Sequence, residues 1–445
     1  MLVPSKPQGA ATGVWSIRSV IRWLNGQFGS TSRKGVLALF DQAVFSGSNF
    51  LTTVVIGRFC GLDQLGVYSL AFAVLVFLAV IHESLIWTPY TIYSHRLKRD
   101  EQPEYAGTVL MMQGLFTLAG ICVLVTMASV LSVGVGPVGL APVMWVLAAA
   151  APCYLLRELI RRLLLARLEV ARVLVIDILV AVVQFGGFVT LYWLGGLSAA
   201  TACAAVGIAC LVISVGWLAT TAKQFVIRPR NVGSHLRRHW SFGRWICASQ
   251  MADSAHNYAL HWLLAVALGT AATGVFAACS SLVLIFNPLI LGIGSVLVPR
   301  AAQVYADGGN AEVRRVVWKT TAFLAAAMAV ICLGLALFGG TALELLYDGQ
   351  EYAGHGLIIT LLAVATLAGT FSFAADHGLW VIERPDINFI VRASGLAITL
   401  TAAFLLVGTW GVAGVAIARL LGMSVASAAQ CTAFVCLTRG QGGDA

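Results

Sequence analysis

Long apolar stretches alternate with short polar connections along most of the chain. Each stretch has the roughly 20 residues that an α-helix needs to cross about 30 Å of hydrocarbon. The stretches occupy residues 38–57, 66–88, 106–131, 141–163, 173–194, 199–219, 243–267, 274–297, 318–341, 355–381, 387–408 and 411–436. The pattern therefore predicts twelve membrane-spanning helices, and no connection between them is long enough to hold a soluble domain.

The stretch 243–267 differs from the others because polar side chains follow one of its helical faces. These side chains, spaced three to five residues apart, are Ser249, Asp253, His256, Asn257 and His261. Hydrocarbon cannot solvate such a face, so it normally lies toward a bundle interior or a water-filled cavity. We predict that this helix lines a substrate cavity, with a functional role for Asp253 and His256.

The first span carries a second polar stripe with similar spacing. Its members are Gln42, Ser46, Asn49 and Thr53. Hydroxyl and amide groups of this kind can hydrogen-bond a polar ligand in a wet cleft, which makes the stripe the expected opposite wall of the cavity. The alternative is hydrogen bonding between helices inside one lobe, which also favours Ser, Thr and Asn.

Composition supports the membrane assignment. Of the 445 residues, 59% are hydrophobic and only 11% are charged, whereas soluble domains carry about 25% charged residues. The ten cysteines lie almost entirely inside apolar stretches and show no CxxC spacing. We expect them to be small packing residues and expect neither disulfides nor a metal site.

The distribution of positive charge predicts the orientation. In the twelve-span arrangement, 26 of the 28 Lys and Arg residues fall on one side, including Arg157 and Arg161 beside the fourth-to-fifth connection. By the positive-inside rule this side is cytoplasmic and holds both termini. The net charge of +9 therefore indicates a membrane surface and not a nucleic acid partner. Arg58 and Arg419 are the two exceptions.

An internal repeat divides the spans into two groups of six. Gly66-Val67-Tyr68 recurs as Gly274-Val275-Phe276, 208 residues later. Six is an even number, so the halves share one orientation and are related by a pseudo-two-fold axis along the membrane normal. The expected organisation begins with a basic cytoplasmic tail (1–35) that is either an amphipathic helix or disordered. A six-helix lobe (36–220), a basic cytoplasmic linker (221–241), a second six-helix lobe (242–437) and a cytoplasmic tail (438–445) follow.

Three stretches carry a resemblance to a known family. They are Gly57-Arg58-Phe59-Cys60-Gly61-Leu62-Asp63-Gln64-Leu65-Gly66-Val67-Tyr68-Ser69-Leu70-Ala71, Leu346-Tyr347-Asp348-Gly349-Gln350-Glu351-Tyr352 and Gly411-Val412-Ala413-Gly414-Val415-Ala416. Here the chain resembles the polysaccharide-transporter family of the MOP flippase superfamily, although Asp348 stands as an insertion before the glycine of the second motif. The resemblance implies an all-α, MATE-like fold of twelve helices in two lobes. It also implies export of lipid-linked oligosaccharides through a cavity between helices one, two, seven and eight.

Ionisable residues inside the predicted spans are further candidates for function. His82 and Glu83 are cavity candidates, and Asp376 and His377 join Asp253 as candidates for ion coupling. Asp41 and Asp177 lie near span ends and are expected to reach the headgroup region or to pair locally.

Three arginines are candidates for binding a diphosphate, which needs cationic partners in a low-dielectric site. They are Arg244, Arg300 and Arg419. The alternative roles are topological anchoring for the first two and pairing with a buried acid for Arg419.

We therefore predict a flippase that moves undecaprenyl-diphosphate-linked oligosaccharides across a bacterial inner membrane by alternating access. No catalytic set and no phosphate-binding loop is evident, so we expect neither enzyme activity nor a cofactor. Expected partners are membrane lipids and, for surface polysaccharide export, a polymerase with its chain-length machinery. The alternatives are a cation-coupled MATE-type drug exporter, a major-facilitator transporter, disfavoured because its cytoplasmic loop motif is missing, and a membrane-embedded polysaccharide polymerase or ligase.

Overall fold

The computed structural model describes residues 29–94, 97–98, 101–221, 225–226, 232–348, 350–382 and 384–440, and every regular element in these ranges is helical. The predicted amphipathic helix near the N-terminus lies outside them. The elements are α2 (Gly29–Cys60), α3 (Leu62–His82), η1 (Glu83–Trp87), α4 (Thr88–Ser94), α5 (Gln102–Ser132), α6 (Leu140–Ala166), α7 (Val170–Trp193), α8 (Ala199–Thr221), α9 (Val232–Leu268), α10 (Thr270–Leu284), α11 (Asn287–Tyr347), η4 (Gln350–Tyr352), α12 (Gly356–Val381) and α13 (Pro385–Gly440).

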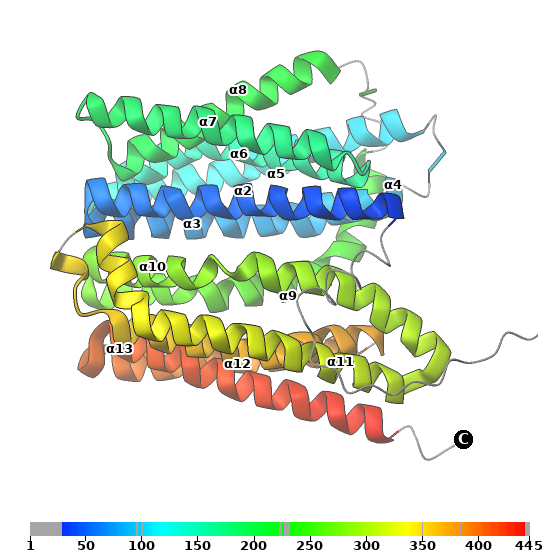
Figure 1. Cartoon of the computed structure of the whole chain (residues 1–445). Coiled ribbons are helices and arrows are strands. Elements are labelled where there is room, and N and C mark those ends of the chain that lie inside the picture. Colours follow the sequence, from blue (N-terminus) through cyan, green and yellow to red (C-terminus); the bar gives the residue numbers. More distant parts are fainter. Residues whose placement is uncertain are drawn as a thin grey trace, which may run out of the picture.

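The helices form two bundles that lie side by side (Figure 1). The N-terminal lobe contains α2 to α8, and the C-terminal lobe contains α9 to α13. The lobes meet mainly where α3 packs against α10 and α9. The all-helical, two-lobed architecture predicted from the sequence is therefore confirmed.

Within the described ranges, nine helices are long and apolar enough to cross a membrane, and Thr270–Leu284 is a shorter apolar helix. One of the nine, Asp386–Thr438, has 53 residues, which is more than twice the length that one crossing needs. It holds two predicted spans that are separated by a kink at Gly411 (φ 56°, ψ −135°). The exact number of twelve spans remains a prediction.

Two helices begin earlier than the hydropathy pattern predicts. Helix α2 starts at Gly29, inside the expected N-terminal tail, and α9 starts at Val232, inside the expected linker 221–241. Basic residues lower the hydropathy of both stretches without opposing helix formation, because Arg and Lys are good helix formers. Part of the predicted linker is therefore a helical extension of α9.

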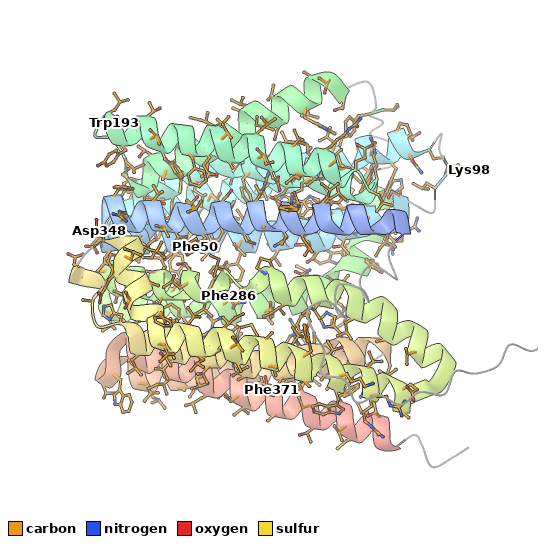
Figure 2. The ribbon with its side chains drawn as sticks, in the orientation of Figure 1. Phe50, Lys98, Trp193, Phe286, Asp348 and Phe371 are labelled. Atoms are coloured by element: carbon orange, nitrogen blue, oxygen red, sulfur yellow. The ribbon has the colours of Figure 1, made fainter. Side chains whose placement is uncertain are left out.

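The two ends of the bundle can be named by single residues. Trp193 and Asp348 lie at one end and Lys98 lies at the opposite end (Figure 2). We call these the Asp348 end and the Lys98 end. This arrangement agrees with the predicted alternation, which puts Trp193 and Asp348 on one side of the membrane and Lys98 on the other.

A reciprocal crossing of α3 and α10 joins the lobes at the Asp348 end. A Cβ atom on Gly66 would overlap the carbonyl oxygen of Thr270, and one on Gly274 would overlap the carbonyl oxygen of Leu62. Each of these carbonyls lies four residues before the partner glycine, so the contact is symmetric. The pseudo-two-fold axis therefore passes between the two repeated glycines.

The residues before the crossing repeat the same symmetry. Gly61 and Gly269 precede α3 and α10 with φ 84°, ψ 175° and φ 92°, ψ 179°. This backbone region is essentially restricted to glycine. The 208-residue repeat thus includes a shared backbone turn in addition to the sequence match.

A π-helical turn, η1, interrupts the continuous helix Leu62–Ser94. Such turns arise where an extra residue enters an α-helix, and they often occur at functional sites. The carbonyl of Leu85 in this turn receives a hydrogen bond from Nδ1 of His239 on α9 (3.0 Å). Gly243 lies so close to the carbonyl of Ser84 that a Cβ atom would overlap it. The N-terminal extension of α9 therefore docks onto the N-terminal lobe at η1.

Candidate functional site

Helix α9 positions most of the polar residues at the lobe interface, because it packs against α13 and α10 of its own lobe and against α3 and η1 of the other. Of the residues predicted on its polar face, His256 and His261 are buried, and Asp253 is exposed. Ser249 and Asn257 are half-buried. The structure thus gathers the predicted face of α9 on one wall.

Arg392 of α13 connects two of the predicted coupling residues. Its Nη1 atom lies 3.0 Å from Oδ1 of Asp253, and its Nη2 atom lies 2.9 Å from Oδ2 of Asp376 on α12. Gln430 donates a further hydrogen bond to Oδ1 of Asp376 (3.3 Å). The Asp376 side chain is 8% exposed and the Asp253 side chain 56%. Asp376 is consequently a fixed internal acid, whereas Asp253 can respond to what lies beside it.

Arg419 lies further along α13 and has no acidic partner within ion-pair distance among the described side chains. Its Nη2 atom donates a hydrogen bond to the amide oxygen of Asn257 (2.9 Å). The nearby His256 leaves its buried Nε2 atom without a hydrogen-bond partner in the described structure, and Arg419 is an electrostatic neighbour of both histidines of this wall. The alternative prediction that Arg419 pairs with a buried acid is not what the structure contains. A guanidinium held only by a neutral amide is available to an anion.

The predicted stripe of α2 divides between two environments. Asn49 lines a small cavity inside the N-terminal lobe, together with Gln184 of α7. Gln42 donates to the hydroxyl of Ser46 (3.2 Å), and the hydroxyl of Thr53 donates to the backbone of Asn49 (3.1 Å). These bonds stay within α2 and reach no second helix, so the role of the stripe as a cavity wall remains a prediction.

His82 and Glu83 are held inside the N-terminal lobe. His82 is 1% exposed, and its ring contacts the Leu78 carbonyl through Nδ1 (2.8 Å) and the Thr117 hydroxyl through Nε2 (3.4 Å). Glu83 forms an ion pair with Arg162 (2.9 Å). These partners of His82 and Glu83 lie in the N-terminal lobe and not on the polar wall of α9.

The remaining predicted site residues are His377, Arg244 and Arg300. His377 contacts the Phe373 carbonyl through Nδ1 (2.8 Å). Arg244 is exposed, with its guanidinium 5.7 Å from the Trp245 ring centroid. Arg300 falls within α11, and its side chain is outside the described part of the structure.

A buried ionic network in the N-terminal lobe is not predicted as a unit by the sequence. Arg157 contacts Asp177 (2.6 Å) and Glu158 (2.5 Å), and Arg161 contacts Asp177 (3.1 Å) and Asp41 (2.6 Å). Asp41 and Asp177 are therefore paired, but with arginines of α6 that are distant in the sequence and not with near neighbours; Arg172 pairs with Glu169 instead. The signal for the network is the four-residue spacing of the two arginines, which puts both on one face of α6.

This network corrects the interpretation of the cytoplasmic charges. The charge pattern counts Arg157 and Arg161 as loop cations, but their side chains are only 6% and 8% exposed. Arg392 is counted in the same way and lies between two acids. The positive-inside rule depends on sequence position and carries no information about side-chain direction, so it includes internal arginines near helix ends.

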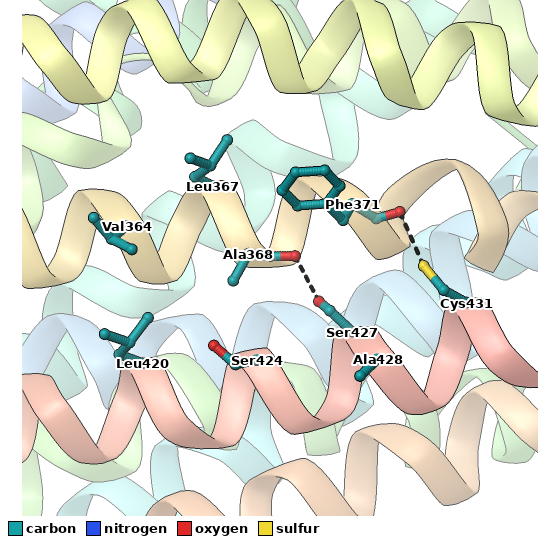
Figure 3. Close-up of a pocket in the computed structure, with 9 residues that line it drawn as sticks. All are labelled: Val364, Leu367, Ala368, Phe371, Leu420, Ser424, Ser427, Ala428 and Cys431. Carbon is teal, nitrogen blue, oxygen red and sulfur yellow. Dashed lines mark hydrogen bonds between the residues drawn. The ribbon is translucent and has the colours of Figure 1, made fainter.

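A separate apolar groove of about 330 Å³ lies between α12 and the second half of α13. Figure 3 shows its lining, where Ser427 donates to the carbonyl of Ala368 (2.6 Å) and Cys431 to that of Phe371 (3.4 Å). None of the predicted site residues lines this groove. Within the described residues, no group of three or more His, Cys, Asp or Glu side chains could hold a metal ion.

Solved structures with the same fold belong to the MOP superfamily. An inward-facing multidrug resistance MATE family transporter is 15% identical, with a TM-score of 0.74, and the match covers 93% of this chain and 96% of that one. The MATE multidrug transporter DinF-BH is also 15% identical, with a TM-score of 0.69 and 98% of both chains covered. A MOP superfamily transporter from Pyrococcus furiosus is 15% identical, with a TM-score of 0.66 and coverages of 92% and 95%. A search of curated proteins finds no match.

The fold is that of multi-pass membrane transporters of the MOP superfamily. Residues 92–354, more than half of the chain, match the family model described as a polysaccharide biosynthesis protein. The chain belongs to this family, the polysaccharide transporters of the superfamily. The resemblance seen in the sequence is thereby confirmed.

Proposed function

We propose that the protein is a flippase for lipid-linked oligosaccharides, in particular undecaprenyl-diphosphate-linked repeat units, in a bacterial inner membrane. Membership of the polysaccharide biosynthesis family supports the substrate class. The observation that carries the proposal is Arg419, a cation at the lobe interface whose hydrogen-bond partner is the neutral Asn257. A diphosphate group supplies the anionic partner that this guanidinium lacks.

In this mechanism the diphosphate and first sugars bind along the wall formed by α9 and α13, while the lipid tail stays in the bilayer. Arg419 binds the diphosphate, and His256 offers a free ring nitrogen for a further hydrogen bond. Rocking of one lobe against the other then exposes the head group on the opposite side. The glycan is then accessible to a polymerase that acts on that side of the membrane.

The proposal is tested with purified protein in vesicles that contain a fluorescent lipid-linked glycan, by measuring how fast the glycan becomes accessible to an added quencher. Replacing Arg419→Gln removes the charge and should slow translocation at least about tenfold, the effect expected from losing one charge-assisted contact of about 1.5–3 kcal/mol. Arg419→Lys should retain part of the rate. Arg172→Gln, which changes an exposed arginine of the N-terminal lobe, is the matched control. Equal rates for Arg419→Gln and the wild-type protein would refute the role of Arg419.

One observation favours a second candidate function, a cation-coupled drug exporter. The Asp253 carboxylate is 56% exposed at the lobe interface, where it could bind a cation or a cationic drug. This function predicts drug efflux that depends on a proton or sodium gradient and that is lost in Asp253→Asn. Gradient-driven efflux without any glycan translocation would favour the exporter over the flippase.

A further inference from the structure

The last turn of α2 meets the connection between α11 and α12 at the Asp348 end. These two segments lie in different lobes, nearly 300 residues apart in the sequence. They are also two of the three stretches that carry the family resemblance. The proposed transport function uses neither of them, so their contact requires a separate explanation.

Arg58 makes three contacts across the lobe boundary. Its Nη2 atom lies 2.8 Å from Oδ2 of Asp348, and its Nη1 atom donates to the carbonyls of Leu345 (3.1 Å) and Leu346 (3.4 Å). These carbonyls belong to the last turn of α11, where a helix has free acceptors and a partial negative charge. Arg58 therefore caps a helix of the opposite lobe.

Two buried tyrosines shape the rest of the contact. Tyr347 and Tyr352 are 1% and 3% exposed, with ring centroids 4.9 Å apart. The Tyr352 hydroxyl donates to the carbonyl of Gly57 (2.9 Å), and a Cβ atom on Gly57 would lie only 2.5 Å from the Tyr347 ring. Gly57 thus lets α2 approach the C-terminal lobe closely.

We propose that Gly57, Arg58, Tyr347, Asp348 and Tyr352 form a clasp that holds the Asp348 end of the protein closed and opens once in each transport cycle. The reciprocal glycine crossing lies beside this clasp, and there Thr270 donates to Asp63 across the lobes (2.6 Å). The hydrogen bonds and the ion pair of the clasp join one lobe to the other. The lobes cannot part at this end while it is intact.

The exposure of the ionic contact makes the clasp reversible. The Arg58 and Asp348 side chains are 37% and 71% exposed, and exposed ion pairs of this kind change an equilibrium by no more than about fivefold. Such a contact biases the closed form without locking it. The buried tyrosines determine how closely the two lobes fit, and the ion pair adjusts the equilibrium between the closed and open forms.

A native cysteine provides a reporter for clasp opening. Cys279 on α10 is fully buried and is an electrostatic neighbour of both tyrosines of the clasp. In lipid nanodiscs, the rate at which a maleimide modifies Cys279 can be followed by mass spectrometry of its peptide. The measurement needs no substrate, so its failure is distinct from a failure of the proposed flippase function.

Charge reversal supplies the decisive variants. Arg58→Glu places a carboxylate against Asp348 and the end of α11, and should raise the Cys279 modification rate about fivefold. Asp348→Arg should do the same. The double variant Arg58→Glu with Asp348→Arg restores opposite charges and should return the rate toward that of the wild-type protein.

The matched control is Arg172→Glu, which breaks an exposed ion pair with Glu169 inside the N-terminal lobe and should leave the rate unchanged. If a reversed variant fails to give a monodisperse protein, Arg58→Gln and Asp348→Asn test the same contact with smaller expected increases. Wild-type rates in all clasp variants would overturn the proposal. So would an increase in the double variant as large as in the single ones.

Discussion

His239 is a buried histidine with a hydrogen-bond partner at each ring nitrogen. Its Nδ1 atom contacts the Leu85 carbonyl, its Nε2 atom lies 2.7 Å from the Tyr105 hydroxyl, and its ring is fully buried. The neutral ring donates from Nδ1 and accepts at Nε2. Burial lowers the pKa of His239 to about 4 from its ordinary value of 6.5, more than the hydrogen bond to Leu85 raises it.

This pKa predicts acid sensitivity in a defined range. Because the folded-state pKa is the lower one, the unfolded chain binds more protons between pH 6.5 and pH 4, so stability falls as the pH decreases through this range. The expected loss at about pH 4 is about 3 kcal/mol. His239→Gln keeps a donor and an acceptor but cannot titrate. Near neutral pH the wild-type protein should have the higher melting temperature, and this difference should shrink as the pH falls toward 4. A difference in melting temperature that stays constant with pH would contradict this role of His239.

For single residues, the sequence predicts which polar side chains lie inside the spans better than it predicts the partners of those side chains. The spacing of Asp253, His256 and Asn257 puts them on one face of a helix, because helical periodicity requires no knowledge of the neighbouring helices. The partner of Arg419 could not be predicted, since Asn257 is 162 residues away. The burial of Arg157 could not be predicted for the same reason, because its partner Asp177 lies on another helix.

Among whole elements, the crossing of α3 and α10 depends on having no side chain at two positions. Gly66→Ala or Gly274→Ala would place a methyl group against a rigid backbone carbonyl. Overpacking of this kind costs about 1–3 kcal/mol, and separation of the lobes at the Asp348 end relieves it. We therefore expect a lower melting temperature together with faster maleimide modification of Cys279.

Gly114→Ala on α5 is the matched control, because no atom lies within 4 Å of its added Cβ. It should stabilise the protein by about 0.5–1 kcal/mol, as alanine generally does when it replaces glycine inside a helix. Similar effects of all three substitutions would mean that the crossing does not depend on close approach.

Hydropathy predicts most helices but not their irregularities. Helices α5 to α8 follow the apolar stretches closely, because burial in lipid requires long uninterrupted apolar sequence. The π-helical turn at Glu83–Trp87 leaves no such signal, since one additional residue in a helix does not change local hydropathy. The early start of α9 at Val232 escapes prediction because its first turns contact protein and water.

For the whole molecule, we expect the Lys98 end to face the cytoplasm. Lys98 and Arg172 are exposed, and both lie in predicted cytoplasmic connections. Trypsin should therefore cleave at these two sites in inverted membrane vesicles and leave both sites intact in right-side-out vesicles, as judged by fragment sizes on immunoblots. Cleavage only in right-side-out vesicles would reverse the orientation.

The repeat of 208 residues and the positive charge pattern are enough to predict two lobes of shared orientation. They cannot predict how the lobes meet, because the contacting residues of the clasp are nearly 300 positions apart and mix backbone carbonyls with side chains. Every residue has a backbone carbonyl, so the sequence does not indicate which carbonyls accept a hydrogen bond from the other lobe. This is why two stretches that resemble the family separately are not expected to touch.

The symmetric contact of Gly66 with Gly274 has a consequence for ancestry. A contact in which each partner uses the same atoms is self-complementary, and self-complementary contacts are the ones that two identical chains can form. A half-length protein with one such segment, a glycine turn followed by the crossing glycine, could therefore form a dimer with its own copy through this crossing. Duplication and fusion of its gene would preserve the interface unchanged, and later divergence of the two halves could then place Arg419 in one lobe and the buried ionic network in the other.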